Sequence, residues 1–221
     1  MNIKLRPFSR IAFSGKMPDR GFTLVELLVV IGIIALLAGV SSSAITNAMK
    51  MATNAKCVSN MHSIGPAFFG YLNDHNYIMP QRKYDDGTPY FVVLAPYSGS
   101  GTPSKSNNVF VCPAQPSNDF PNEPSYGMNW YYDNFSYSNV SSTSTTIMVA
   151  ETYGSEGTGS NRADRNSGDP GELDPARHNG KSNYLFFDGH VEKLHYSDTT
   201  VPIGSTDMWG TDDGNHDVMS P

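Results

Sequence analysis

The sequence predicts an α+β protein: a long N-terminal helix, transmembrane in its first half, followed by a loop-rich domain with a small β-sheet. Three observations support this class. They are an apolar run near the N-terminus, an apolar stripe at helical spacing after it, and short β-prone segments separated by stretches rich in Gly, Pro, Ser and Asn. A chain of 221 residues is long enough for one membrane-anchored domain with its own core.

The apolar run spans 22–40, and its 19 residues carry one charge, on Glu26. That is about the length that a helix needs to cross the hydrocarbon core of a bilayer. The 21 residues before it hold five basic side chains and one acidic side chain. Basic flanks stay in the cytoplasm by the positive-inside rule, so we expect a single span with the C-terminal body outside the cytoplasm.

Glu26 distinguishes this run from ordinary apolar segments. The alternatives are a secretory signal peptide cut after Val40, a plain signal anchor and a buried core helix. A carboxylate inside a membrane costs about 2.5–3.5 kcal/mol, however, and usually has a role. Cleavage between Gly21 and Phe22 would provide one. Glu26 would then lie in the first helical turn, where the dipole favours its charge and where it can neutralise the α-amino group of Phe22 or of a neighbour.

The segment Gly21-Phe-Thr-Leu-Val-Glu26, with the apolar run behind it, resembles the processing site of type IV prepilins and type II secretion pseudopilins. The resemblance implies that a prepilin peptidase removes the leader 1–21 after Gly21 and methylates the new N-terminal Phe22. It also implies that Glu26 is needed for ordered filament assembly. The implied fold is pilin-like: the second half of the helix lies on a small antiparallel sheet, in a protein of the bacterial inner membrane.

The helix is predicted to continue outside the membrane through 41–76. No strong helix breaker occurs between Val40 and Gly65. Pro66 should kink the helix or remove one of its hydrogen bonds. Apolar residues spaced four, three, four and three apart predict one buried helix face: Cys57, Met61, Ile64, Phe68 and Tyr71.

Residues 77–199 are predicted to form the globular β domain, and 200–221 an acidic polar tail. Asp188-Gly189 is a favoured two-residue hairpin turn between the last two strand candidates. Four β-prone segments are strand candidates: 109–112, 147–151, 183–187 and 190–196.

The charge and the cysteine content of the chain beyond residue 21 limit the classes of partner that it can bind. Beyond residue 21 the chain has ten basic and twenty acidic side chains. We therefore expect no nucleic acid, and cations or basic surfaces of neighbouring subunits fit better. Cys57 and Cys112 form no CxxC pair and alone are too few for a zinc site. An exported domain permits a disulfide between them, and two buried thiols are the alternative.

A second resemblance covers much of the body. His178, followed after nine residues by Asp188-Gly189, is similar to the H-X9-DG signature of prepilin-like proteins abundant in planctomycete- and verrucomicrobium-type bacteria. Three further segments fit the same pattern: 57–60, 110–113 and 125–129.

Catalysis is not expected. His178 and Asp188 could orient a base, but no nucleophile accompanies them at a known spacing, and phosphate-loop and zinc-protease motifs are absent. We expect Asp188-Gly189 to form the turn and His178 to hydrogen-bond a nearby loop, with a metal or ligand contact as a further alternative. The protein is therefore predicted not to be an enzyme.

Calcium is the only cofactor that the sequence brings into consideration. Asp213, Asn215 and Asp217 alternate as oxygen ligands of a calcium loop can, although the segment departs from the EF-hand pattern. A solvated acidic tail is the alternative. A group of aromatic residues could bind a glycan or pack in the core: Tyr126, Trp130, Tyr131, Tyr132 and Tyr137.

The predicted function is that of a structural subunit in a type IV pilus-like or type II secretion pseudopilus filament. Its expected partners are the prepilin peptidase, the inner membrane, and like or related pilin subunits that pack through the N-terminal helix. The alternative is a membrane-anchored envelope protein that uses the same processing and binds glycan or calcium.

Overall fold

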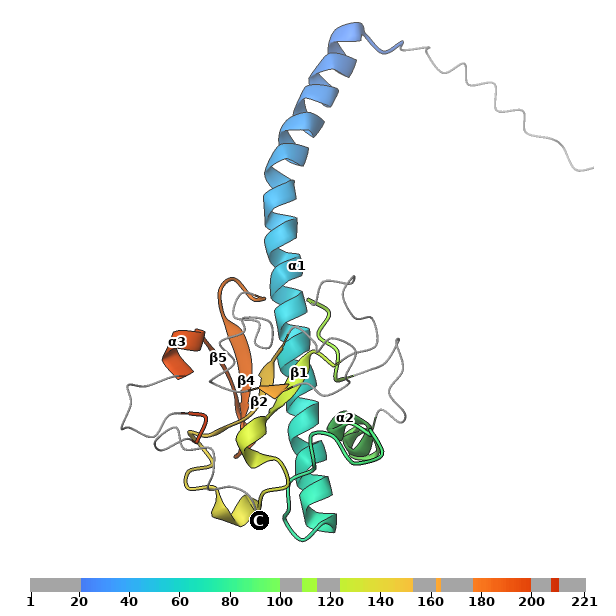
Figure 1. Cartoon of the computed structure of the whole chain (residues 1–221). Helices are drawn as coiled ribbons and strands as arrows, with labels where there is room; N and C mark the ends of the chain where they lie inside the picture. Colours follow the sequence, from blue (N-terminus) through green and yellow to red (C-terminus); the bar gives the residue numbers. More distant parts are fainter. Residues whose placement is uncertain are drawn as a thin grey trace, which may run out of the picture. The chain divides into compact units, whose positions relative to one another are not determined.

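The fold was analysed on a computed structural model, which describes residues 21–99, 109–114, 124–152, 162–163, 177–199 and 208–210 (Figure 1). The chain divides into two units, residues 1–45 and residues 46–221. Each unit is described by itself below. The arrangement is α+β, as the sequence predicts: a long N-terminal helix and a small, mainly antiparallel sheet.

Helix α1 spans Leu24–Asp74. In the first unit it is built from Leu, Val, Ile, Ala and Gly apart from Glu26 and the three serines at 41–43, and every residue from 21 to 39 is exposed. This helix is long and apolar enough to cross a membrane, and none of its most apolar window is buried within the protein. Leucine and alanine favour the helix locally, but its exposed apolar surface needs lipid or another protein to cover it.

In the second unit, α1 buries the stripe predicted from its spacing. Cys57, Met61, Ile64 and Phe68 are fully buried, and they belong to one hydrophobic core with the strands. Pro66 lies inside α1 and does not end it. The helix stops at Asp74, two residues before the predicted limit of 76.

The sheet has the strand order β3-β1-β2-β4-β5. β1–β2, β2–β4 and β4–β5 pair antiparallel, whereas the two-residue edge strand β3 runs parallel to β1. The predicted small antiparallel sheet is therefore confirmed, with one parallel edge added. The strands span Tyr126–Asn129 (β1), Ile147–Glu151 (β2), Arg162–Ala163 (β3), Ser182–Phe186 (β4) and Val191–Leu194 (β5).

Short helices connect the strands to α1 and to one another. In Figure 1 they lie around the sheet and the lower part of α1. Their bounds are Tyr90–Leu94 (α2), Ala95–Ser98 (η1), Trp130–Tyr132 (η2), Tyr137–Asn139 (η3) and Tyr196–Thr199 (α3).

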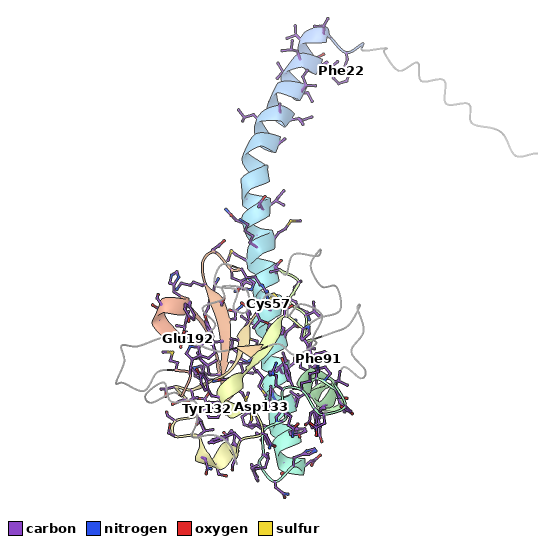
Figure 2. The ribbon with its side chains drawn as sticks, viewed as in Figure 1. Phe22, Cys57, Phe91, Tyr132, Asp133 and Glu192 are labelled. Atoms are coloured by element: carbon purple, nitrogen blue, oxygen red, sulfur yellow. A yellow bond between two sulfur atoms is a disulfide. The ribbon has the colours of Figure 1, made fainter. Side chains whose placement is uncertain are left out.

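Both faces of the central strands are covered. A Cβ added at Gly65 of α1 would meet the Leu185 side chain at 3.5 Å, which places Leu185 against the helix. The neighbouring Tyr184 points to the other face, where its ring lies 6.2 Å from that of Trp209. All residues of β1, β2 and β4 are buried as a result. Figure 2 shows side chains filling the space between the lower part of α1 and the strands.

Trp209 departs from the predicted acidic tail at 200–221. It is fully buried, and its ring nitrogen donates to Thr199 Oγ1 at 3.1 Å. The backbone of its neighbour Met208 accepts a hydrogen bond from Ile147 N. Residues 208–210 are thus part of the folded domain, because a large aromatic ring is needed to cover the outer face of the sheet.

The predicted strand at 109–112 is wrong. These residues form a turn and a bend, and the described residues give them no strand partner. Phe110 and Cys112 are both buried, and the backbone is held instead by Ser125, whose N–H donates to Phe110 O and whose hydroxyl accepts from Cys112 N. β-branched and aromatic composition there reflects burial and not sheet pairing.

The predicted hairpin near the C-terminus is present, but its turn is longer than two residues. β4 ends at Phe186 and β5 begins at Val191, so the connection is 187–190. Gly189 has φ +92°, a value that a side chain disfavours. The longer turn lets Phe187 enter the core while Asp188 N donates to Thr143 O.

Candidate functional site

The start of α1 is closed by a reciprocal capping box. Thr23 N and Thr23 Oγ1 each donate to Glu26 Oε2 at 2.9 Å, and Glu26 N donates back to Thr23 Oγ1 at 3.3 Å. This pairing satisfies backbone groups that the first helical turn leaves open. The T-x-x-E spacing is visible in the sequence, although sequence reasoning placed Glu26 in the first helical turn without recognising the capping box with Thr23.

Gly21 and Phe22 lie just before the helix. Neither belongs to a regular element, and the Phe22 side chain is 82% exposed. A peptide bond outside a helix and open to solvent is accessible to a peptidase, and the following capping box keeps the helix start intact beside it. Residues 1–20 of the predicted leader 1–21 lie outside the described residues.

Comparison with known proteins identifies this N-terminal segment. Residues 16–42 match a family model described as the prokaryotic N-terminal methylation motif. The N-terminus is a prokaryotic methylation motif. The match is consistent with type IV pilins and pseudopilins, and it carries with it processing by a prepilin peptidase. No curated protein and no solved structure matches the chain.

The methylation motif covers Gly21, Phe22 and Glu26 but ends before the globular domain. Together with the exposed apolar half of α1, it supports anchoring of the protein in a membrane. His178, Asp188 and Gly189 lie outside the matched segment.

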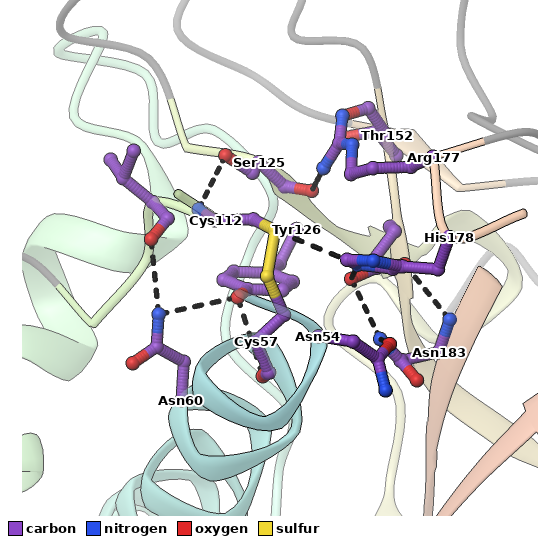
Figure 3. A network of polar contacts seen from close by, with 12 residues as sticks. Asn54, Cys57, Asn60, Cys112, Ser125, Tyr126, Thr152, Arg177, His178 and Asn183 are labelled. Carbon is purple, nitrogen blue, oxygen red and sulfur yellow. Dashed lines mark hydrogen bonds and ion pairs between the residues drawn. A yellow bond between two sulfur atoms is a disulfide. The ribbon is translucent and has the colours of Figure 1, made fainter. Parts of the chain in front are cut away.

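His178 is buried in a polar network at the edge of the core (Figure 3). Its Nε2 lies 3.0 Å from Glu151 Oε1, and Glu151 is fully buried at the end of β2. Asn183 of β4 holds the same carboxylate with two hydrogen bonds, from its backbone N to Oε2 at 2.9 Å and from its Nδ2 to Oε1 at 3.0 Å. The histidine partner is therefore a strand carboxylate rather than the loop expected from the sequence.

Cys57 and Cys112 meet beside this pair and form a disulfide, with a Cα–Cα distance of 5.2 Å. Cys112 Sγ lies 3.8 Å from His178 Nε2. The bond ties α1 to the segment around 112 and closes a separation of 55 residues. Both sulfurs are buried, so the disulfide lies inside the core and not on the surface.

Two further side chains, those of Tyr126 and Arg177, position the network. Tyr126 of β1 accepts a hydrogen bond from Asn60 and donates to Cys57 O at 3.4 Å, and burial raises the pKa of its hydroxyl above the usual range. Arg177 donates to Ser125 O. Strands β1, β2 and β4 and helix α1 all contribute, so the network joins the main elements of the domain.

Asp188 is separate from this network. It follows β4, whereas His178 precedes that strand, so the two signature residues lie at opposite ends of it. Asp188 Oδ1 accepts from His190 N at 3.0 Å and lies 2.6 Å from His190 Nδ1. Burial raises the pKa of Asp188, but these contacts with His190 outweigh it and hold the pKa below its ordinary value.

Glu151 was missed by sequence reasoning. It ends the apolar segment Ile147–Glu151, and a carboxylate directly after four apolar residues was the available signal. The predicted calcium candidates Asp213, Asn215 and Asp217 lie outside the described residues. Most of the aromatic group is core: Tyr126, Tyr131 and Tyr132 are at most 8% exposed, which leaves them little surface for a glycan.

Proposed function

We propose that this protein is a structural subunit of a type IV pilus-like or type II secretion pseudopilus filament. In this proposal the prepilin peptidase cuts after Gly21 and methylates Phe22. The observation that carries the proposal is the methylation motif at 16–42 together with a helix whose residues from 24 to 39 are all exposed and almost all apolar. Lipid would cover that surface before assembly, and neighbouring α1 helices would cover it within the filament.

Glu26 would have two partners in succession. In the single chain its carboxylate caps the helix through Thr23. During assembly it would pair with the Phe22 ammonium of a neighbouring subunit, which removes two charges from an apolar environment. Hydrogen bonds to Thr23 leave one carboxylate oxygen of Glu26, Oε1, for that contact in the described structure.

The domain from residue 46 onward would lie outside the cytoplasm and would have a structural role without catalysis. A buried disulfide supports export, because disulfides persist in oxidising compartments. Burial of His178 against Glu151 supports a role in the fold rather than in chemistry on a substrate.

The test is the mass and N-terminal sequence of the native protein, taken separately from membranes and from sheared surface material. We expect a chain that begins at methylated Phe22 in both fractions. A processed chain found only in membranes would contradict filament assembly and support a membrane-anchored binding protein. An uncleaved chain, or one that begins near Ser41, would contradict processing at this motif.

A further inference from the structure

Four side chains of metal-binding type meet inside the domain. Cys57, Cys112, Glu151 and His178 each present one ligand atom, all four atoms lie within 4.8 Å of one another, and all four residues are buried. They come from α1, the turn at 109–112, β2 and the segment before β4. Residues so distant in sequence meet here only through the fold.

A disulfide alone does not account for this cluster. A cross-link between α1 and Cys112 needs no ionisable neighbours, yet Glu151 is fully buried and His178 is 5% exposed against the sulfurs. Taking a carboxylate and an imidazole out of water is costly even where the two groups pair with each other, so stability alone does not require them here. Two thiolates, an imidazole and a carboxylate are, in contrast, the ligand types that Zn²⁺ takes in proteins.

The surroundings of Glu151 resemble the outer shell of a metal site. Asn183 fixes both carboxylate oxygens, as groups behind metal ligands do. Asn183 is itself fully buried, and its Oδ1 has no hydrogen-bond partner in the part of the chain that the structure describes. A buried acceptor without a donor is unusual, and it shows that the polar groups around Glu151 are not fully satisfied among the described residues.

We propose that the reduced domain binds one Zn²⁺ ion through Cys57 Sγ, Cys112 Sγ, His178 Nε2 and one carboxylate oxygen of Glu151. Zn–S bonds of about 2.3 Å and Zn–N or Zn–O bonds of about 2.0–2.2 Å place tetrahedral ligand atoms about 3.3–3.8 Å apart. The Cys112 Sγ–His178 Nε2 distance of 3.8 Å already fits. Breaking the S–S bond lets the two sulfurs separate toward the same spacing.

Loading begins with reduction of the Cys57–Cys112 bond by a dithiol or a phosphine. A dithiol gives two electrons and two protons and becomes a disulfide, whereas a phosphine gives two electrons and takes an oxygen atom from water, whose two protons convert the sulfurs to thiols. Each resulting thiol loses a proton when it binds Zn²⁺ as a thiolate. His178 binds as a neutral imidazole with its proton on Nδ1, so Nε2 exchanges its contact with Glu151 for the metal.

The site has an approach from outside and a suitable electrostatic setting. A cavity of about 680 Å³ reaches His178 and Asn54, and Lys50, Arg177 and Lys193 also line it. Zn²⁺ with two thiolates and one carboxylate has a net charge of −1, and these basic side chains stabilise it. Disulfide and metal are therefore two alternative links between α1 and the segment around Cys112.

The test uses the full chain in detergent, purified without a histidine tag, with Co²⁺ as the spectroscopic probe and Zn²⁺ as competitor. After phosphine reduction, we expect one equivalent of Co²⁺ with the strong visible absorption of a tetrahedral thiolate site, displaced by one equivalent of Zn²⁺. The oxidised chain is a folded control that lacks thiolates and should bind at least 100-fold more weakly.

Glu151→Gln keeps the shape of the side chain but removes its charge and should weaken Co²⁺ binding at least 10-fold. The matched control His195→Ala removes an exposed histidine outside the cluster and should bind as the unmodified chain does. Absence of the tetrahedral spectrum in the reduced chain, or equal binding by the oxidised chain, would overturn the proposal. So would a spectrum and affinity that Glu151→Gln leaves unchanged.

Discussion

His178 Nε2 and Glu151 Oε1 lie 3.0 Å apart in the core, and this pair gives the histidine of the H-X9-DG pattern a structural partner. The partner belongs to β2, far from the histidine in sequence. Asn183 completes the contact from β4. The pattern thus marks the place where the C-terminal hairpin joins the rest of the sheet.

Glu151→Ala should destabilise the domain by about 3–5 kcal/mol, because it leaves a buried imidazole and two Asn183 donors without their acceptor. Chemical denaturation followed by tryptophan fluorescence would measure the change in unfolding free energy. Glu192→Ala, on the exposed side of β5, is the matched control and should change it by less than about 0.5 kcal/mol. Equal effects of the two variants would contradict the role given to Glu151.

Replacing both Cys57 and Cys112 by serine should lower the unfolding free energy by about 4 kcal/mol. The estimate follows from the conformational entropy that the unfolded chain loses when a disulfide closes a loop over a sequence separation of 55 residues. Thermal unfolding of the oxidised protein, the reduced protein and the double variant would measure it. Oxidised protein that unfolds at the same temperature as the double variant would contradict a stabilising disulfide.

Trp209→Ala should cost about 3–5 kcal/mol, as large aromatic deletions in a core do. The side chain is fully buried against Tyr184, so its removal opens the outer face of the sheet. Near-ultraviolet circular dichroism and denaturation would report the loss. Trp209→Phe keeps a ring but loses the donor to Thr199, so its loss of unfolding free energy should be smaller. An alanine variant as stable as the original chain would place the residue outside the core.

Asp188 should make stability depend on pH in the acidic range. Its pKa is lower in the folded protein than the ordinary value of 3.8, so folding favours the carboxylate. The contribution is then fully present above about pH 3.8 and is lost as the pH falls through the lower folded value. The stability difference between the original chain and Asp188→Asn should therefore shrink below pH 4, and a difference that stays constant with pH would be the contrary result.

Glu26→Ala should leave the domain from residue 46 onward as stable as before but prevent incorporation into filaments. Within the described chain the side chain hydrogen-bonds only with Thr23, and Glu26 is not one of the core residues. Thr23→Ala is the matched control, because it removes the cap but keeps the carboxylate and should still assemble. Sheared filaments probed for each variant would decide, and normal assembly of Glu26→Ala would refute the assembly role.

Local patterns predicted the fold better than they predicted the site. The spacing of Cys57, Met61 and Ile64 identifies the buried face of α1, because helical periodicity is a property of one segment. The strand at 147–151 also agrees with β2. Both predictions depend only on neighbouring residues.

Contacts between distant segments lie beyond such patterns. The local signal for Glu151, a carboxylate directly after four apolar residues, does not show that the side chain is buried, since that burial depends on His178 and Asn183. Trp209 stands in a polar stretch, and only the open outer face of the sheet explains its burial. At 109–112 the local pattern misled in the opposite way, because β-prone residues predicted a strand and the chain there forms a turn and a bend.

The position of Trp209 also constrains the order of events during biosynthesis. The core begins with α1, which emerges from the ribosome early, but the outer face of the sheet stays open until Trp209, which follows all five strands in sequence, has been synthesised. The domain consequently cannot reach its final packing as soon as its strands are complete. An unfinished chain exposes the apolar side of β4 throughout this interval, when factors that shield nascent chains have access to it.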